Sequence, residues 1–175
     1  LQIGRRGGIL VNGGLGGGCV AGLIHTTAPF GVRWSLACGP HEGVSELASL
    51  REDGLSREGV TLATCNRTEI YAVEDNGDPF ARITEILSAR LGEDASRFIY
   101  VRRDRDVASH LFGVAAGLDS MILGESQIQG QVKDAWEACR AESGPILNRM
   151  FQNALLAATR AREETGIGRG AASVS

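Results

Sequence analysis

The sequence predicts an α+β fold, a ferredoxin-like βαββαβ sandwich followed by two to three helices. Four short apolar runs typical of strands alternate with two stretches of helical apolar spacing. Their order along the chain is strand, helix, strand, strand, helix, strand, which is the split βαβ arrangement. Beyond residue 105 the apolar spacing is helical, which predicts the additional helices.

The four strands are predicted from short apolar runs in the first 101 residues. They are CVAGLI at 19–24, GVTLATC at 59–65, TEIYAVE at 68–74 and RFIYV at 97–101. The second and third runs flank Asn66 and Arg67, so two polar residues interrupt an otherwise β-like stretch.

The two helices of the sandwich are predicted from apolar residues that recur on one side. The first covers residues 41–52. The second opens at Asp78 and Pro79 and runs through Arg90, because proline in the first turn suits a helix start. The residues expected to face inward are Val44, Leu47, Ala48 and Leu50 in the first helix and Ile83, Ile86 and Leu87 in the second.

Three more helices are predicted in the second half of the chain, over 106–116, from Ser126 onward, and from Pro145 to about Gly166. Ser126 and Gln129 match an S-x-x-Q capping box, and Gly166 is a suitable stop. The expected inward residues are Val107, Leu111, Val114 and Leu118; Ile128, Val132, Ala135, Trp136 and Cys139; and Leu147, Met150, Phe151, Ala154 and Ala158.

Composition narrows the functional classes. A net charge of −3 over 175 residues argues against strong nonspecific binding to nucleic acid. Arg102, Arg103 and Arg105 form either a local basic patch or a solvated helix entrance. The four cysteines have neither C-x-x-C spacing nor a close histidine, so we expect no metal site, no disulfide and a reducing cytosol; they are Cys19, Cys38, Cys65 and Cys139.

The ends of the chain are rich in glycine. Residues 1–18 are expected to be a disordered or artefactual leader, 19–165 the functional domain, and 166–175 a truncated link. Gly16, Gly18 and Ala21 satisfy G-x-G-x-x-A, but no helix pattern follows to hold a pyrophosphate. No stretch is long and apolar enough to span a membrane.

Two stretches carry candidate chemistry. In ATCNRTEIYAV at 63–73, Arg67 lies two residues from Cys65, and a nearby positive charge favours the nucleophilic thiolate; the alternative is a small core cysteine. In GLDSMILGESQIQGQ at 117–131, Gln127 and Gln131 share a helix face, and Ser120 and Glu125 precede them. These groups form either a polar pocket for a small zwitterion or a capped helix with solvated glutamines.

Three segments resemble the glutamyl-tRNA reductase family. They are TCNRTEIYAV at 64–73, HLFGVAAGLDSMILGESQIQGQVKDAW at 110–136 and GLIHTTAP at 22–29, and the resemblance runs from about Val20 to Ser175. It implies that Cys65 attacks the ester carbonyl of glutamyl-tRNA to give a thioester. In the family, NADPH then reduces the thioester to glutamate-1-semialdehyde for tetrapyrrole (porphyrin) biosynthesis.

The resemblance also implies roles for individual residues. His110 matches a histidine important for activity, beside Cys65 as the second catalytic residue. The substrate-binding positions are Thr64, Cys65, Asn66, Arg67, Ser120, Glu125, Ser126, Gln127 and Gln131. The sequence departs from the family at Ile24, where the family usually has Asn, at Gly113, where it has a basic residue, and at Ser126, where it has Pro.

In the family, the motif near GIGRGAASVS leads into an NADPH-binding domain and a helical dimerisation domain. We therefore expect this chain to bind no cofactor, to be monomeric and cytoplasmic, and to stop at thioester formation and hydrolysis on glutamyl-tRNA. Two alternatives remain open: a stand-alone cysteine acyl hydrolase, and a noncatalytic tRNA-binding module.

Overall fold

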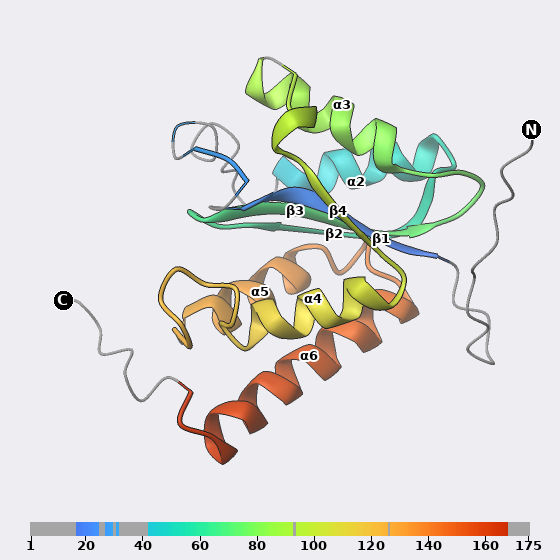
Figure 1. Ribbon diagram of the computed structural model, residues 1–175. Helices are drawn as coiled ribbons and strands as arrows, with labels where there is room; N and C mark the ends of the chain where they lie inside the picture. Colours follow the sequence, from blue (N-terminus) through green and yellow to red (C-terminus); the bar gives the residue numbers. More distant parts are fainter. Residues whose placement is uncertain are drawn as a thin grey trace, which may run out of the picture.

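The computed structural model describes residues 17–24, 27–29, 31, 42–92, 94–125 and 127–167. The elements follow one another in the predicted order, and the predicted α+β class is confirmed (Figure 1). They are β1 (Gly18–Ile24), α2 (Glu42–Glu52), β2 (Ser56–Ala63), β3 (Arg67–Glu74), α3 (Phe80–Leu91), a 3₁₀ turn η1 (Ser96–Phe98), β4 (Tyr100–Arg103), α4 (Arg105–Ala115), α5 (Gln127–Ala138) and α6 (Pro145–Glu164).

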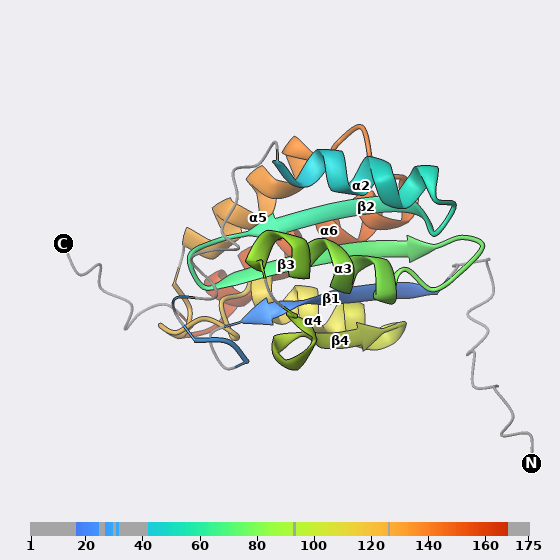
Figure 2. The same cartoon turned by 90° about the horizontal axis from the view of Figure 1, so that it is seen from above.

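The sheet has the order β2-β3-β1-β4, and every neighbouring pair is antiparallel. Helices α2 and α3 cover one face, while α4, α5 and α6 cover the other (Figures 1 and 2). Because β3 is a central strand with helices on both sides, residues 67–73 are all buried. A charged side chain within residues 67–73 therefore loses its contact with water.

One strand was misplaced by the sequence prediction. Residues 96–98 form the 3₁₀ turn, and the last strand begins only at Tyr100. The carboxylate of Asp94 accepts hydrogen bonds from the backbone N–H and the hydroxyl of Ser96, both at 2.9 Å. Such local side-chain bonds compete with the sheet ladder and start a turn instead. β2 is also shifted from the predicted range 59–65: it begins at Ser56, three residues earlier, and ends at Ala63, two residues earlier.

The predicted apolar stripes of the three later helices pack into the core below the sheet. Nearly all of the residues expected to face inward are buried or partly buried there. Leu118 is the exception and is 49% exposed. Gly117, at φ 77°, follows the end of α4 and turns the chain away, so Leu118 lies on a loop.

Other expectations meet the limits of the described residues. Ser126 of the predicted capping box lies outside them. The side-chain amide of Gln129, the other residue of that box, donates to the Leu155 carbonyl and the Thr159 hydroxyl of α6. Residues 1–16 and 168–175, and with them most of the predicted leader and link, also lie outside. Within the described ranges no helix is long and apolar enough to cross a membrane.

Helix α6 is attached to the sheet by a carboxylate at its first turn. Glu58, a β2 residue that is only 5% exposed, accepts hydrogen bonds from the backbone N–H of Ile146 (3.2 Å) and Leu147 (2.7 Å). A Cβ on Gly144 would lie 2.5 Å from the carboxyl carbon of Glu58, so glycine permits this approach. The carboxylate satisfies two N–H groups that have no partner within the helix and complements the helix dipole.

We expect Glu58→Ala to lower the free energy of unfolding by about 1–2 kcal/mol, because loss of a helix-capping side chain usually costs that much. Urea denaturation measures the change. Glu137→Ala is the matched control, since Glu137 is 54% exposed and, among the described side chains, pairs with Lys133 on the helix surface. If both variants unfold at the same urea concentration, the cap contributes nothing to stability.

Candidate active site

Cys65 lies in the tight turn that joins β2 to β3. The Thr64 N–H donates to the Arg67 carbonyl at 2.8 Å. The Thr64 hydroxyl accepts from the N–H groups of Asn66 and Arg67, both at 3.2 Å. These bonds close the turn, and the Cys65 residue at its tip is exposed. The alternative of a core cysteine is thus wrong for Cys65, and it holds for the buried Cys139.

A small pocket opens beside this turn, with a cavity volume of about 30 Å³. Three segments of the chain form its walls: the β2–β3 turn, the loop 117–125 and the first turns of α5. Its lining residues are Thr64, Cys65, Asn66, Arg67, Ser120, Glu125, Gln127, Ile128 and Gln131. The pocket thus brings together every predicted substrate-binding residue except Ser126, which lies outside the described residues.

The loop 117–125 is closed on itself at its base. The Gly124 N–H donates to the Gly117 carbonyl at 2.9 Å, and both glycines have positive φ angles. A Cβ on Gly117 would lie 3.1 Å from the Gly124 Cα, which favours glycine. Guanidinium groups hold the loop from two elements: Arg67 of β3 donates to the Asp119 carbonyl, and Arg162 of α6 donates to the carbonyls of Gly124 and Glu125.

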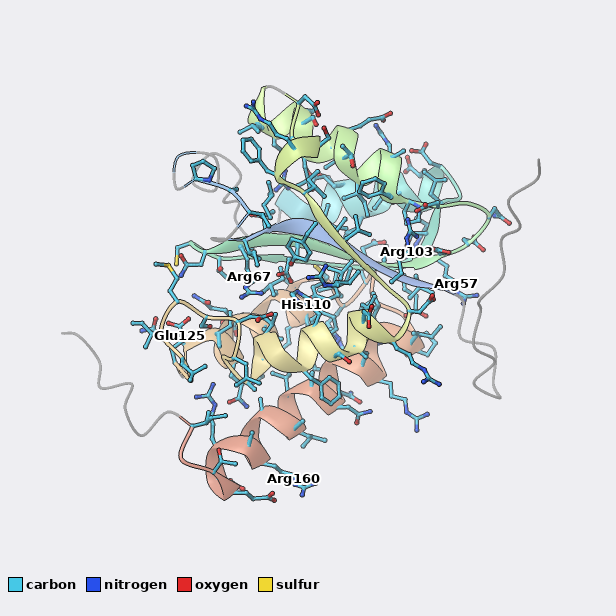
Figure 3. The ribbon with its side chains drawn as sticks, viewed as in Figure 1. Arg57, Arg67, Arg103, His110, Glu125 and Arg160 are labelled. Atoms are coloured by element: carbon cyan, nitrogen blue, oxygen red, sulfur yellow. The ribbon has the colours of Figure 1, made fainter. Side chains whose placement is uncertain are left out.

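Arg67, which lines the pocket, forms a buried ion pair with Glu69, which does not. The Arg67 Nη1 lies 2.8 Å from the Glu69 Oε1, and the two side chains are 1% and 0% exposed. The hydroxyls of Tyr71 and Tyr100 donate to the Glu69 carboxylate, and the His110 Nε2 lies 3.1 Å from the Oε1. Figure 3 shows Arg67 and His110 in the layer between the sheet and α4.

The network keeps Glu69 ionised. Burial acts to raise the pKa of Glu69, but the hydrogen bond from His110 and the positive charges around it outweigh burial and lower the pKa to about 2. Burial acts to lower the pKa of Arg67, and the charge of Glu69 raises it instead. Burial and then the Glu69 charge raise the pKa of both tyrosines, which therefore remain neutral hydrogen-bond donors.

His110, predicted as catalytic, is not among the residues that line the pocket. Its side chain is 7% exposed, with Nε2 3.1 Å from both the Glu69 Oε1 and the Tyr100 hydroxyl. Its Nδ1 lies 3.4 Å from the Asp119 Oδ2, on the pocket loop. The imidazole is therefore linked to the pocket indirectly. Glu69 pairs with Arg67, and Asp119 precedes Ser120, and both Arg67 and Ser120 line the pocket.

Sequence reasoning missed four members of this network, namely Glu69, Tyr71, Tyr100 and Asp119. A signal for two of them exists, because Arg67, Glu69 and Tyr71 occupy alternate positions of one strand and share a face. An acidic residue in the middle of a buried strand requires a partner. Nothing in the sequence places Tyr100 and Asp119 next to that face.

The basic patch considered for residues 102–105 is partly neutralised. Arg103 pairs with Glu74 at 2.8 Å and with Asp78 at 2.6 Å. This finding favours the interpretation of a solvated surface over a nucleic-acid contact at that arginine.

The G-x-G-x-x-A match near the start of the chain does not have the geometry of a dinucleotide fingerprint. Its Gly18 and Ala21 lie within β1 itself, whereas the fingerprint requires a turn between a strand and a helix. Within the described ranges no cluster of three or more metal-ligating side chains occurs.

Comparisons with known proteins agree on one family. A family model described as the N-terminal domain of glutamyl-tRNA(Glu) reductase matches residues 21–165. The glutamyl-tRNA reductase of Chloroflexus aurantiacus is 45% identical over 166 residues, which cover 89% of this chain and 38% of that protein. That of Aquifex aeolicus is 41% identical over 161 residues, covering 89% and 39%.

Among solved structures, the chain is similar to glutamyl-tRNA reductase from Methanopyrus kandleri, with a TM-score of 0.69 and 29% sequence identity. The match covers 85% of this chain and 35% of that one. The chain thus spans about two fifths of the length of the curated relatives named above.

We expect Glu69→Gln to destabilise the protein at neutral pH by about 3–5 kcal/mol, because Arg67 then stays buried without a counter-charge. The folded-state pKa of Glu69, about 2, lies below the ordinary value of 4.5, so its stabilisation is present above pH 4.5 and is lost as the pH falls toward 2. The difference between parent and variant should therefore shrink over that range.

Urea denaturation at pH 7, 4.5 and 3 measures this difference, with Glu137→Gln as an exposed control. A difference that is equal at pH 7 and pH 3 would show that ionisation of Glu69 contributes nothing to stability.

Proposed function

Because the chain belongs to the glutamyl-tRNA reductase family through its amino-terminal domain, we propose that Cys65 takes the glutamyl group from glutamyl-tRNA as a thioester. One observation carries this proposal: the exposed Cys65 lines the same pocket as the polar side chains of two other segments. A nucleophile at a turn tip, with an acidic residue, two glutamines and an arginine around it, suits a small zwitterionic acyl group.

In the proposed step the Cys65 thiolate attacks the acyl carbon of the ester. A carbon–sulfur bond forms, the bond from the acyl carbon to the ribose oxygen breaks, and that oxygen leaves with a proton as the free tRNA. Thiolates are strong nucleophiles, and covalent capture divides one difficult reaction into two easier ones. The thioester carbonyl accepts a hydride better than the oxygen ester, because sulfur donates less electron density to it.

Arg67 and Glu125 supply charges that match a glutamyl group. Glu125 is the partner for the α-ammonium. Arg67 lines the pocket, donating from Nη1 to Glu69 and from Nη2 to the Asp119 carbonyl. A guanidinium has five N–H donors in all. We propose that a remaining donor binds the substrate carboxylate, and that Glu69 orients the guanidinium for it.

We propose His110 as a positioning residue for this pocket, since its imidazole contacts Glu69 and the side chain of Asp119. Tyr100 donates to Glu69 and lies within hydrogen-bond distance of the same imidazole nitrogen, which restricts both groups. A direct catalytic role of His110 stays a prediction from the sequence.

The reduction itself is proposed for the longer relatives and not for these residues. The resemblance implies NADPH as the reductant, and Gly18 and Ala21 of the G-x-G-x-x-A match lie within β1 instead of at a strand-to-helix turn. We therefore assign to this domain the binding of glutamyl-tRNA, the formation of the acyl-enzyme and, where water reaches it, its hydrolysis.

We expect intact-protein mass spectrometry to detect a glutamyl adduct after incubation with glutamyl-tRNA, and Cys65→Ser to abolish it. The serine hydroxyl is nearly the same size as the thiol but is far less nucleophilic. Cys139→Ala is the control and should keep the adduct, since Cys139 is buried away from the pocket.

Each other result identifies an alternative. An adduct on Cys65→Ser would mean another nucleophile, and no adduct on the parent would favour a tRNA-binding module. An adduct that decays quickly to free glutamate would support the acyl hydrolase.

We expect Arg67→Lys to reduce the rate of adduct formation about 10- to 100-fold, in line with the loss of one charge-assisted hydrogen bond worth about 1.5–3 kcal/mol. A lysine ammonium keeps the charge but lacks the planar fork that reaches Glu69, Asp119 and the substrate together. Quenched-flow trapping of the adduct measures the rate. Arg160→Lys on the exposed surface of α6 is the control, and equal rates for both variants would exclude a directional role for Arg67.

A further inference from the structure

Arg162, near the end of α6, contacts the pocket loop through two consecutive carbonyls. Its Nη1 donates to the Gly124 carbonyl at 3.0 Å and its Nη2 to the Glu125 carbonyl at 2.8 Å. These two residues close the loop 117–125, and the side chain of Glu125 lines the pocket. Arg162 itself is not among the lining residues.

We propose that Arg162 is a positioning residue that holds Glu125 in the orientation needed to receive the ammonium of the acyl group. This inference rests on the proposed function. Two parallel bonds to adjacent carbonyls fix the backbone of Glu125 in both position and rotation, and the direction of its side chain follows from the backbone. A single bond would leave the peptide free to rotate.

Stabilisation of α6 alone does not account for this arginine. A cation in the last turn favours the helix dipole, but a lysine there supplies the same charge. Moreover, the Arg162 Nε is buried and has no hydrogen-bond partner within the described part of the chain, which costs stability. The fork directed at two carbonyls is the feature that only arginine provides.

The loop is fastened at a second point that does not involve α6. Arg67 donates to the Asp119 carbonyl at 2.7 Å, next to Ser120 on the pocket wall. Loss of Arg162 should therefore release Glu125 while the Cys65 turn and the Ser120 end of the loop stay in place. The expected effect is on substrate affinity and not on the reactivity of the thiol.

The test compares the 175-residue parent with Arg162→Ala and Arg162→Lys, and with Arg160→Ala as the matched control. Arg160 lies two residues away on the same helix, is 73% exposed and pairs only with Glu164 among the described side chains. Initial rates of glutamyl-adduct formation are measured against glutamyl-tRNA concentration. The rate at which iodoacetamide alkylates Cys65 measures the reactivity of the thiol in a reaction that involves no glutamyl group.

For Arg162→Ala we expect the half-saturating glutamyl-tRNA concentration to rise about tenfold, which is the change for about 1.4 kcal/mol. The maximal rate and the alkylation rate should stay within about twofold of the parent, and added guanidinium ion should partly restore the affinity. Arg162→Lys should show an intermediate loss that guanidinium does not repair. Arg160→Ala should match the parent.

Hydrogen exchange gives a second readout, in which the amides of Gly124 and Glu125 should exchange faster in both Arg162 variants. An unchanged half-saturating concentration in a folded Arg162→Ala protein would overturn the inference. A fall of about tenfold in the alkylation rate of Cys65 would overturn it as well. If Arg162→Ala does not fold, Arg162→Lys decides by the same measures. A parent that forms no adduct contradicts the proposed function and this inference with it, whereas an adduct with unchanged half-saturation contradicts the inference alone.

Discussion

The buried ion pair between Arg67 and Glu69 is the interaction on which the rest of the site depends. It lies on β3, a central strand covered by helices on both faces, where neither charge is exposed to water. An isolated charge in such a place costs several kcal/mol, so each group must be satisfied by its neighbours. The neighbours come from β4, α4 and the loop 117–125, and the requirement for compensation thereby fixes these segments relative to the Cys65 turn.

This arrangement links stability to pre-organisation of the pocket. The guanidinium that compensates Glu69 also lines the pocket and holds the Asp119 carbonyl of the loop. Groups that are already held need not be ordered when a ligand binds in a pocket, which lowers the entropic cost of binding. His110 takes part at the same point, because its two nitrogens face carboxylate oxygens of Glu69 and Asp119.

Much of the fold could be predicted from apolar periodicity, since the order of strands and helices along the chain and the buried faces of α3 to α6 follow from it. The prediction was wrong where local effects competed with that periodicity. At Asp94 and Ser96 a side-chain hydrogen bond forms a turn, and at Gly117 a positive φ angle turns the chain and leaves Leu118 exposed. The pocket residues were found through sequence motifs. The network behind them was missed because its contacts form only through tertiary packing. Tyr100 meets Glu69 from 31 residues away in sequence, and Asp119 meets Arg67 and His110.

The turn that carries Cys65 has a consequence beyond this reaction. Its three closing hydrogen bonds use the main chain and the hydroxyl of Thr64, so none of these three bonds uses the side chain at position 65. Under the proposed function, the groups that close the turn and the atom that reacts are therefore different. A selenocysteine at position 65 keeps these three bonds available and puts a selenol where the thiol now lies.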